Sequence, residues 1–306
     1  MLVQLDNDTY LKPNKVIFTD FLNRWLVEYA KPNLSPRTAE GYEYIIKKHL
    51  IPAFGKIPLS KLKPEHLQKY YADKQNGGLS AQTVRHHHTI MHKALKTAME
   101  WELLHRNVAD SVSRHRAQRI EMQTWNEHEV NQFLEAAKTT PYFALFYLAL
   151  FTGMRRSEIL ALRWQDLDFL MGEISINRSL HKLKGGKIIL RSPKTKTGKR
   201  TVALPPSAFL VLNDHRKEHE ANCLLLGTIL SESDYVFNKL GKPLLPDSVS
   251  HAWIKIIKRI GIKPIRFHDA RHTHASLMLK QGIHPKIVQE RLGHSSLQLR
   301  LILIPM

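Results

Sequence analysis

Residues 152–164 read Thr-Gly-Met-Arg-Arg-Ser-Glu-Ile-Leu-Ala-Leu-Arg-Trp, and residues 268–273 read His-Asp-Ala-Arg-His-Thr. In each stretch an arginine, Arg155 or Arg271, stands where an apolar helical pattern meets polar residues. One arginine in such a place is more often part of a surface ion pair. Two planar guanidinium groups that meet can instead hold the oxygens of a phosphate-like anion. These stretches therefore predict an anion site built from distant parts of the chain.

Three further polar positions have the same character. Lys196 lies in Pro-Lys-Thr-Lys-Thr-Gly-Lys-Arg, His268 opens the second stretch, and His294 lies in Leu-Gly-His-Ser-Ser. We favour Lys196 over Lys194 and Lys199 because the Lys-Thr-Gly turn would place it at the tip of a hairpin. Each residue alone is more often structural or solvated, and only their combination indicates a site.

The composition indicates a globular protein with a polyanionic partner. The chain has 306 residues, of which 43% are hydrophobic, enough for two domains. Lys and Arg number 46 against 27 Asp and Glu, for a formal net charge of +19. The basic residues are spread along the chain and no basic amphipathic anchor stands out, which favours nucleic acid over an acidic membrane surface.

Cysteine usage and the length of the apolar runs limit where in the cell the protein can be located. Cys223 is the only cysteine, so no internal disulfide can form, and its Leu-rich neighbourhood predicts a buried thiol. The longest apolar run, residues 143–151, is too short to span a bilayer, and no secretory signal precedes it. We expect a cytoplasmic protein without a membrane segment.

The first half of the chain predicts a helical domain over residues 15–112, after a tail or linker at 1–14. Lys31-Pro32-Asn33 is expected to end the first helix, and residues 51–59 are expected to form a turn-rich connection. Residues 113–122 are expected to be a basic linker. The expected helices are Val16 to Lys31, 36–49, 64–74 and, with Ser80 as its cap, 81–100.

The second domain is predicted over residues 123–306. Its expected fold, with the first domain, is mainly α with one small antiparallel β-sheet (α+β). The expected strands are 173–176, 187–190 and 200–204, and the expected helices include 142–151, 206–226, 247–260, 269–280 and 285–292.

No metal or cofactor site is predicted. His86, His87 and His88 are consecutive in a helix and point about 100° apart. His268 and His272 share a helix face, but no third ligand is identifiable. No group of carboxylates suited to Mg²⁺ stands out.

In order and spacing, the box around Arg155, the Lys196 turn, the box around Arg271 and the Leu-Gly-His turn resemble the tyrosine recombinases, or phage integrases. The resemblance runs from about Val16 to Gln298. It implies a SAM-like, helical core-binding domain followed by a catalytic domain that clamps double-stranded DNA at attachment-type sites. It also implies site-specific integration or excision of a mobile element or phage. Many such integrases carry an arm-site domain before the core-binding domain.

The resemblance assigns the roles of the site residues. Arg155 and Arg271 would hold the non-bridging oxygens of the scissile phosphate, and His294 would bond the same phosphate. His268 would assist proton transfer at the nucleophile, and Lys196 would protonate the leaving 5′ oxygen. Glu158 and Asp269 are expected to orient the arginines.

The sequence after Gln298 departs from the family pattern. Relatives continue with a segment such as Thr-Thr-Leu-Asp-Thr-Tyr-Ser-His, whose Tyr becomes joined to the DNA 3′ end. Here Leu-Arg-Leu-Ile-Leu-Ile-Pro-Met follows, with Ile304 at the position of the Tyr. Deleting one nucleotide from a coding frame for Gln-Thr-Thr-Leu-Asp-Thr-Tyr-Ser-His and the start of Val yields the nine residues 298–306. We therefore expect a frameshifted, cleavage-defective copy.

Alternatives to a functional recombinase stay open. A naturally shortened variant could retain function, and a DNA-binding remnant could block an intact relative. A helical transcription factor would explain the charge but not the converging Arg, Lys and His residues. Homo-oligomers on DNA are expected for the family, but the altered C-terminus leaves the oligomeric state open.

Overall fold

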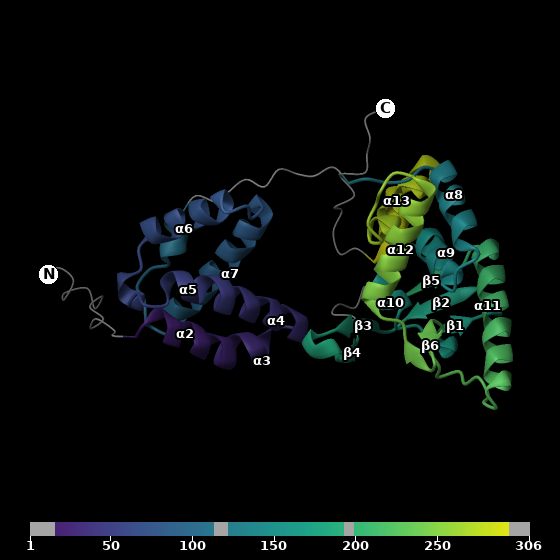
Figure 1. Cartoon of the computed structure of the whole chain (residues 1–306), viewed down its shortest axis with the longest axis horizontal. Coiled ribbons are helices and arrows are strands. Elements are labelled where there is room, and N and C mark those ends of the chain that lie inside the picture. The colour runs from purple at the N-terminus through teal and green to yellow at the C-terminus, as the bar shows by residue number, and fades with distance from the viewer. Residues whose placement is uncertain (1–15, 113–121, 193–198, 294–306) are drawn as a thin grey trace, which may run out of the picture. The chain divides into compact units, whose positions relative to one another are not determined.

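The chain divides into two compact units, residues 1–120 and 121–306. The computed structural model describes residues 16–112, 122–192 and 199–293 (Figure 1). The tail before residue 15 and almost all of the predicted basic linker lie outside the described residues, as do Lys196, His294 and Ile304. The prediction of a mainly α protein with small antiparallel strands is confirmed.

The first unit is built of helices around one apolar core. Its largest fully buried side chains include Trp25, Phe18 and Tyr71. The predicted cap is present: the Ser80 hydroxyl accepts the amide of Thr83 at 3.2 Å. The helices are α2 (Phe18–Trp25), η1 (Leu26–Ala30), α3 (Lys31–Asn33), α4 (Pro36–Ile45), η2 (Ile46–Leu50), α5 (Ile51–Phe54), η3 (Leu59–Lys61), α6 (Pro64–Asn76), α7 (Ala81–Glu100) and η4 (Val108–Ser111).

Two helical segments of this unit pass through a proline. The first ends at Asn33, which confirms the prediction that Lys31-Pro32-Asn33 ends this helix. The second includes α5, which corrects the prediction that the turn-rich connection begins at residue 51. The residue before each proline, Lys31 or Ile51, donates its amide to the carbonyl five residues earlier, in a π-type turn. In a regular α-helix the proline ring clashes with the carbonyl four residues back. The wider turn moves that carbonyl away, so the helix continues.

The three consecutive histidines of α7 face apart, as their helical spacing indicates. The rings lie against three different tyrosines: His86 against Tyr42, His87 against Tyr70 and His88 against Tyr71. Burial lowers the pKa of His87 to about 4, and its Nδ1 lies 2.9 Å from the Tyr70 hydroxyl. His87 is therefore a neutral core residue at pH 7.

The second unit places helices around short antiparallel strands (Figure 1). Its elements are α8 (Glu127–Ala137), α9 (Phe143–Thr152), α10 (Arg156–Ile159), η5 (Trp164–Asp166), β1 (Leu167–Asp168), β2 (Glu173–Ile176), β3 (Ser179–Lys182), η6 (Lys184–Gly186), β4 (Ile188–Arg191), β5 (Arg200–Ala203), α11 (Pro206–Leu225), β6 (Asn238–Lys239), β7 (Lys242–Pro243), α12 (Pro246–Ile260), α13 (Asp269–Lys280) and α14 (Pro285–Leu292).

The strands form three small sheets, where one was predicted. The orders are β1-β2-β5, β3-β4 and β6-β7. After β2 the chain turns at Asn177 and Arg178, whose side chains both donate to the buried Asp166 carboxylate, at 3.3 and 3.1 Å. This turn starts β3, which takes β4 as its partner. β3 escaped prediction because Leu180 is its only buried residue.

Trp253 of α12 is the centre of the second unit's core. Its ring centroid lies 5.1 Å from that of Trp125, 4.2 Å from Phe133 and 5.3 Å from Phe146. Its indole N–H donates to the Ile265 carbonyl at 2.9 Å. The core therefore fixes the segment that leads into α13.

The prediction of a buried Cys223 is wrong, because its side chain is partly exposed. The neighbouring Leu224, Leu225 and Leu226 are 72%, 85% and 68% exposed. The buried residues of α11 are confined to its first half, so its last turns extend beyond the core. Among the described residues no helix is long and apolar enough to cross a membrane.

The end of α9 brings three helices close together. Gly153 has a left-handed backbone with φ of +64°. A Cβ atom there would lie 2.6 Å from Cδ2 of Leu292 in α14 and 2.7 Å from Cδ2 of His274 in α13. Both the backbone conformation and the close approach therefore require glycine.

We predict that Gly153→Ala lowers the free energy of unfolding by about 2 to 4 kcal/mol, through left-handed strain and overpacking. Gly261→Ala is the control, because Gly261 has φ of +70° but nothing within 4 Å of its Cβ position. It should lose only about 1 to 2 kcal/mol. Urea denaturation followed by circular dichroism measures both, and equal losses would show that the close approach carries no cost.

Candidate active site

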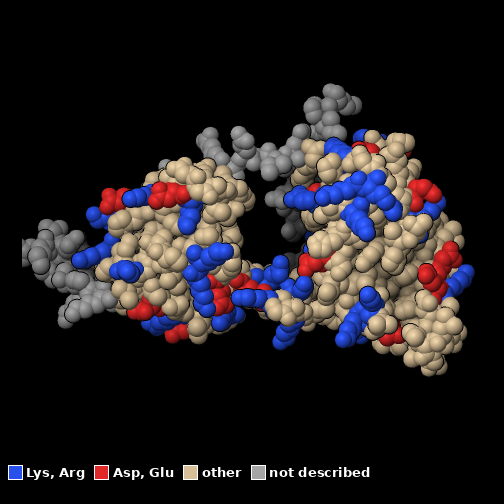
Figure 2. All heavy atoms as spheres, in the orientation of Figure 1, with Lys and Arg blue, Asp and Glu red and all other residues tan. Residues whose placement is uncertain are grey.

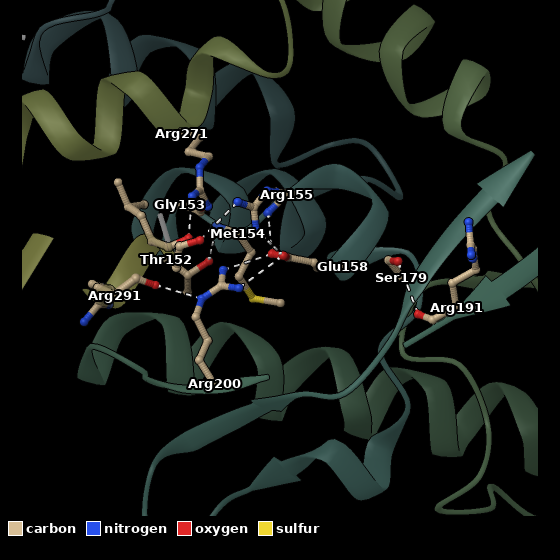
Figure 3. Close-up of polar contacts among 12 residues, drawn as sticks. Thr152, Gly153, Met154, Arg155, Glu158, Ser179, Arg191, Arg200, Arg271 and Arg291 are labelled. Carbon is tan, nitrogen blue, oxygen red and sulfur yellow. Dashed lines mark hydrogen bonds and ion pairs between the residues drawn. The ribbon is translucent and has the colours of Figure 1, made fainter. Parts of the chain in front are cut away.

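A buried carboxylate, Glu158, lies at the centre of the candidate site (Figure 3). Its side chain is 7% exposed. Arg155 precedes α10 and contacts it twice: the backbone amide donates to Oε2 at 2.9 Å and Nη1 donates to Oε1 at 2.7 Å. The prediction that Glu158 orients Arg155 is confirmed by these contacts. The Arg155 side chain is 36% exposed, so its guanidinium can still reach a ligand.

A second arginine, Arg200 of β5, holds the other side of the carboxylate. Its Nη1 donates to Oε1 of Glu158 at 3.1 Å and its Nη2 to Oε2 at 3.0 Å. This two-pronged geometry matches the planar fork of the guanidinium to the plane of the carboxylate. The Arg200 side chain is only 8% exposed. Glu158 therefore joins α10 to β5 inside the protein.

Arg271 of α13 completes the cluster without a carboxylate of its own. The residue is 3% exposed, and its Nη1 donates to the Gly153 carbonyl at 2.7 Å. The site thus gathers side chains from α13, β5 and the start of α10 around the end of α9 (Figure 3). The two predicted arginines, Arg155 and Arg271, are brought together.

The same three arginines bind the end of α14. The last carbonyl groups of a helix have no partner within the helix and need donors from elsewhere. Arg200 Nε donates to the Arg291 carbonyl at 2.9 Å, Arg271 Nη2 to the Leu292 carbonyl, and Arg155 Nη2 to the Gly293 carbonyl at 3.3 Å. The chain therefore leaves α14, toward His294, directly beside the arginine cluster.

The charges in this cluster do not balance. Burial alone would raise the pKa of Glu158, but hydrogen bonds and charge from Arg200 and Arg155 hold it below its usual value. Burial and the charges of Arg155 and Arg200 lower the pKa of Arg271 to about 9, although Glu158 opposes this. Three guanidinium groups thus share one carboxylate. The cluster therefore carries excess positive charge, which would attract an anion.

His268 stands at the N-terminal end of α13, next to this cluster in sequence. Its ring centroid lies 5.5 Å from that of His272. Although His268 is exposed, desolvation by neighbouring atoms lowers its pKa, and His272 and Arg271 lower it further. Neutral imidazole therefore prevails at pH 7, and it can accept a proton.

The expectation that Asp269 orients the site arginines is wrong. Asp269 accepts hydrogen bonds from the Arg266 amide at 2.9 Å and from Arg266 Nε and Nη2 at 3.0 and 2.8 Å. Because Arg266 is three residues earlier, the pair closes the turn that leads into α13. Asp269 thus fixes the start of the helix that carries Arg271.

Sequence reasoning missed Arg200 and Arg291. A usable signal existed for Arg200: the period-two alternation of β5 puts it on the same face as the buried Val202. Arg291 offers no such signal. Its Nη2 donates to the Phe151 and Ala203 carbonyls at 3.3 and 2.9 Å, which only the tertiary fold brings near.

Within residues 16–112, 122–192 and 199–293, no group of three or more His, Cys, Asp or Glu side chains is placed to hold a metal ion.

We predict that Glu158→Gln lowers the free energy of unfolding at pH 7 by about 3 to 5 kcal/mol, since it leaves buried guanidinium groups without their carboxylate. Glu158 has a depressed pKa in the folded state, so its stabilisation is present above the unfolded value of 4.5 and is lost as the pH falls through the folded value. We therefore expect the free energy of unfolding, measured by urea denaturation between pH 3 and pH 7, to fall less with decreasing pH in the variant than in the unaltered chain.

Asp247→Asn is the matched control. It removes the carboxylate that pairs with Lys182, and the Asp247 side chain is 60% exposed. Its effect should stay within about 1 kcal/mol. Similar losses in the two variants would contradict a special role for the buried carboxylate.

Comparisons with known proteins agree with this geometry. Residues 123–300 match the model of the phage integrase family, and residues 17–75 match the phage integrase N-terminal SAM-like domain. The chain is 30% identical over 289 residues to the ICEBs1 integrase of Bacillus subtilis (strain 168), covering 94% of this chain and 78% of that protein. It is 29% identical over 308 residues to a XerC-like tyrosine recombinase of Caldanaerobacter subterraneus subsp. tengcongensis, with 93% and 78% covered.

Among solved structures, the Tn1549 transposon integrase in complex with transposon right end DNA has the same fold. Its TM-score is 0.80 at 19% sequence identity, and 93% of each chain is covered. With a family model matching more than half of its residues, the chain belongs to the phage integrase family.

Proposed function

We propose that this chain is a site-specific DNA recombinase of a mobile element or phage by descent, and that it binds duplex DNA through the arginine cluster. The observation that carries the proposal is the shared carboxylate: Arg155, Arg200 and Arg271 gather around Glu158 alone. A phosphodiester supplies the negative charge that this cluster lacks. The proposal places the chain in the cytoplasm, with its DNA.

In the proposed mechanism Arg155 and Arg271 hold the non-bridging oxygens of the scissile phosphate. They are positioned before DNA arrives, so they can stabilise charge that builds up on these oxygens during phosphoryl transfer. His268, neutral at pH 7, takes part in proton transfer at the nucleophile. Lys196 and His294 complete the proposed set, as proton donor to the leaving 5′ oxygen and as phosphate ligand.

The charge of the surface supports a DNA partner. Figure 2 shows Lys and Arg side chains over the visible face of both units, not confined to one of them. This distribution agrees with the net charge of +19. Lambda integrase has this fold in a dimer bound to a core site and in a tetramer bound to a Holliday junction. The proposal extends to assembly of copies of this chain on DNA.

We further propose that this copy binds DNA without cleaving it. Ile304 stands where relatives have the tyrosine that attacks the phosphate, and no tyrosine follows His294. An alkyl side chain cannot form a phosphotyrosine bond. The arginine cluster can then hold and polarise a phosphate, while strand exchange lacks its nucleophile. Such a chain would occupy recombination sites and compete with an intact relative.

The test uses a nicked suicide duplex that contains the DNA site selected by the full chain from a random-sequence library. We expect salt-sensitive binding, with affinity falling about 10³-fold or more between 50 and 200 mM salt, and no adduct that survives denaturing electrophoresis. The matched variant has residues 299–306 replaced by Thr-Thr-Leu-Asp-Thr-Tyr-Ser-His. It should form the covalent adduct.

Each part of the proposal can fail separately. An adduct with the unaltered chain would overturn the cleavage defect. Absence of any DNA selection would overturn the DNA-binding function. Sequencing the gene tests the frameshift itself, which requires an intact Thr-Thr-Leu-Asp-Thr-Tyr frame one base away.

A further inference from the structure

Arg200 binds Glu158 through two nitrogens and the Arg291 carbonyl at the end of α14 through the third. We propose that Arg200 is a positioning residue that orients Arg155 through Glu158 and fixes the point from which the chain leaves α14. This inference rests on the proposed function and adds a residue to that same site. The resemblance to known integrases assigns it no role.

The first step concerns the orientation of the carboxylate. Arg155 donates to Glu158 from its backbone amide, on Oε2 at 2.9 Å, and from Nη1, on Oε1 at 2.7 Å. Arg200 adds one donor to each oxygen, at 3.1 and 3.0 Å, and its planar fork braces the carboxylate plane from β5. Among the described contacts, Arg200 is the only partner of the Glu158 carboxylate outside Arg155 itself. The direction of the Arg155 guanidinium therefore depends on a carboxylate that Arg200 helps to hold.

The second step concerns α14. The third donor of Arg200, Nε, binds the Arg291 carbonyl at 2.9 Å. Two residues later the Gly293 carbonyl accepts Arg155 Nη2 at 3.3 Å. Arg200 therefore contacts Glu158 directly and holds α14 two residues before Gly293. It shares this end of α14 with Arg271, which donates to the Leu292 carbonyl.

The third step separates this role from DNA contact. Burial does not separate these roles, because Arg271 is 3% exposed and is proposed to hold the phosphate. The partners do separate them. Nε, Nη1 and Nη2 of Arg200 donate to the Arg291 carbonyl and to Glu158, so its charge is paired with a carboxylate (Figure 3). The described donors of Arg271 go to carbonyl groups alone. Arg200 is therefore assigned an action on the phosphate through Arg155, and its removal should cost the phosphate contact of Arg155.

The experiment is a double-mutant cycle on DNA affinity with the full chain and the duplex that it selects. Arg155→Met should weaken binding about tenfold and lower the slope of log affinity against log salt by about one, because one phosphate contact is lost. Arg200→Met should produce the same two changes. The double variant should bind no more weakly than either single variant, since both remove one contact.

Arg178→Met is the matched control. Arg178 also pairs with a buried carboxylate, Asp166, at 3.1 Å, and its side chain is 20% exposed. It makes no described contact with Glu158. Its loss should destabilise the fold and leave the salt slope unchanged. Arg200→Lys, which keeps the charge but loses the fork, should restore part of the affinity, and it replaces Arg200→Met if circular dichroism shows that variant to be unfolded.

An unchanged salt slope in both Arg200 variants, or losses that add up in the double variant, would overturn the positioning role while leaving the proposed function intact. Failure of the unaltered chain to select or bind DNA would overturn the proposed function and this inference with it. Equal changes of the salt slope in Arg178→Met and Arg200→Met would show that both variants bind DNA differently only because their folds are less stable.

Discussion

The site depends on one carboxylate taken out of water. Desolvating Glu158 costs several kcal/mol, and the cost is recovered only if the paired charges have good geometry. Arg155 and Arg200 supply that geometry from opposite directions. Because their backbones belong to the start of α10 and to β5, the ion pairs also join these elements. A single buried charge thus determines where the neighbouring chain segments can lie.

The surplus of arginine in the cluster is physically expensive. A buried guanidinium without a carboxylate partner is stable only where carbonyl oxygens take its hydrogen bonds, and Arg271 finds these at Gly153 and Leu292. The surplus is useful when the missing negative charge arrives with the ligand. A polar environment arranged in advance then needs little rearrangement at the moment of reaction. The unpaired guanidinium charge thus both lowers the stability of the free protein and attracts an anion.

Sequence reasoning succeeded where the signal is local. The helix capped by Ser80 and the helices from Asp269 and Pro285 have the predicted starts, since caps and prolines act on adjacent residues. It failed where distant atoms decide. The turn-rich connection predicted from residue 51 is a helix up to Phe54, because the π-type turn that admits Pro52 depends on how the helix packs. Strand β3 has too few buried residues to show alternation.

The candidate site follows the same division. Arg155 and Arg271 could be found from motif and order, and the structure brings them together. Arg200 was missed because its importance comes from contacts across 42 and 91 positions of sequence. Asp269 was assigned to the wrong arginine, since its partner Arg266 was within reach along the chain. Motifs identified the arginines proposed to bind the ligand, whereas the residues that hold these arginines in place are determined by tertiary packing.

The attachment of α14 has a genetic consequence. The contacts of the arginine cluster within the described residues are made by residues up to Gly293. The change of reading frame proposed above lies after Gln298, so it would leave these contacts in place. Cellular quality control acts on unfolded chains and would not recognise a lost nucleophile. Under the proposed function, a damaged integrase gene would therefore persist as a stable protein after it had stopped moving DNA.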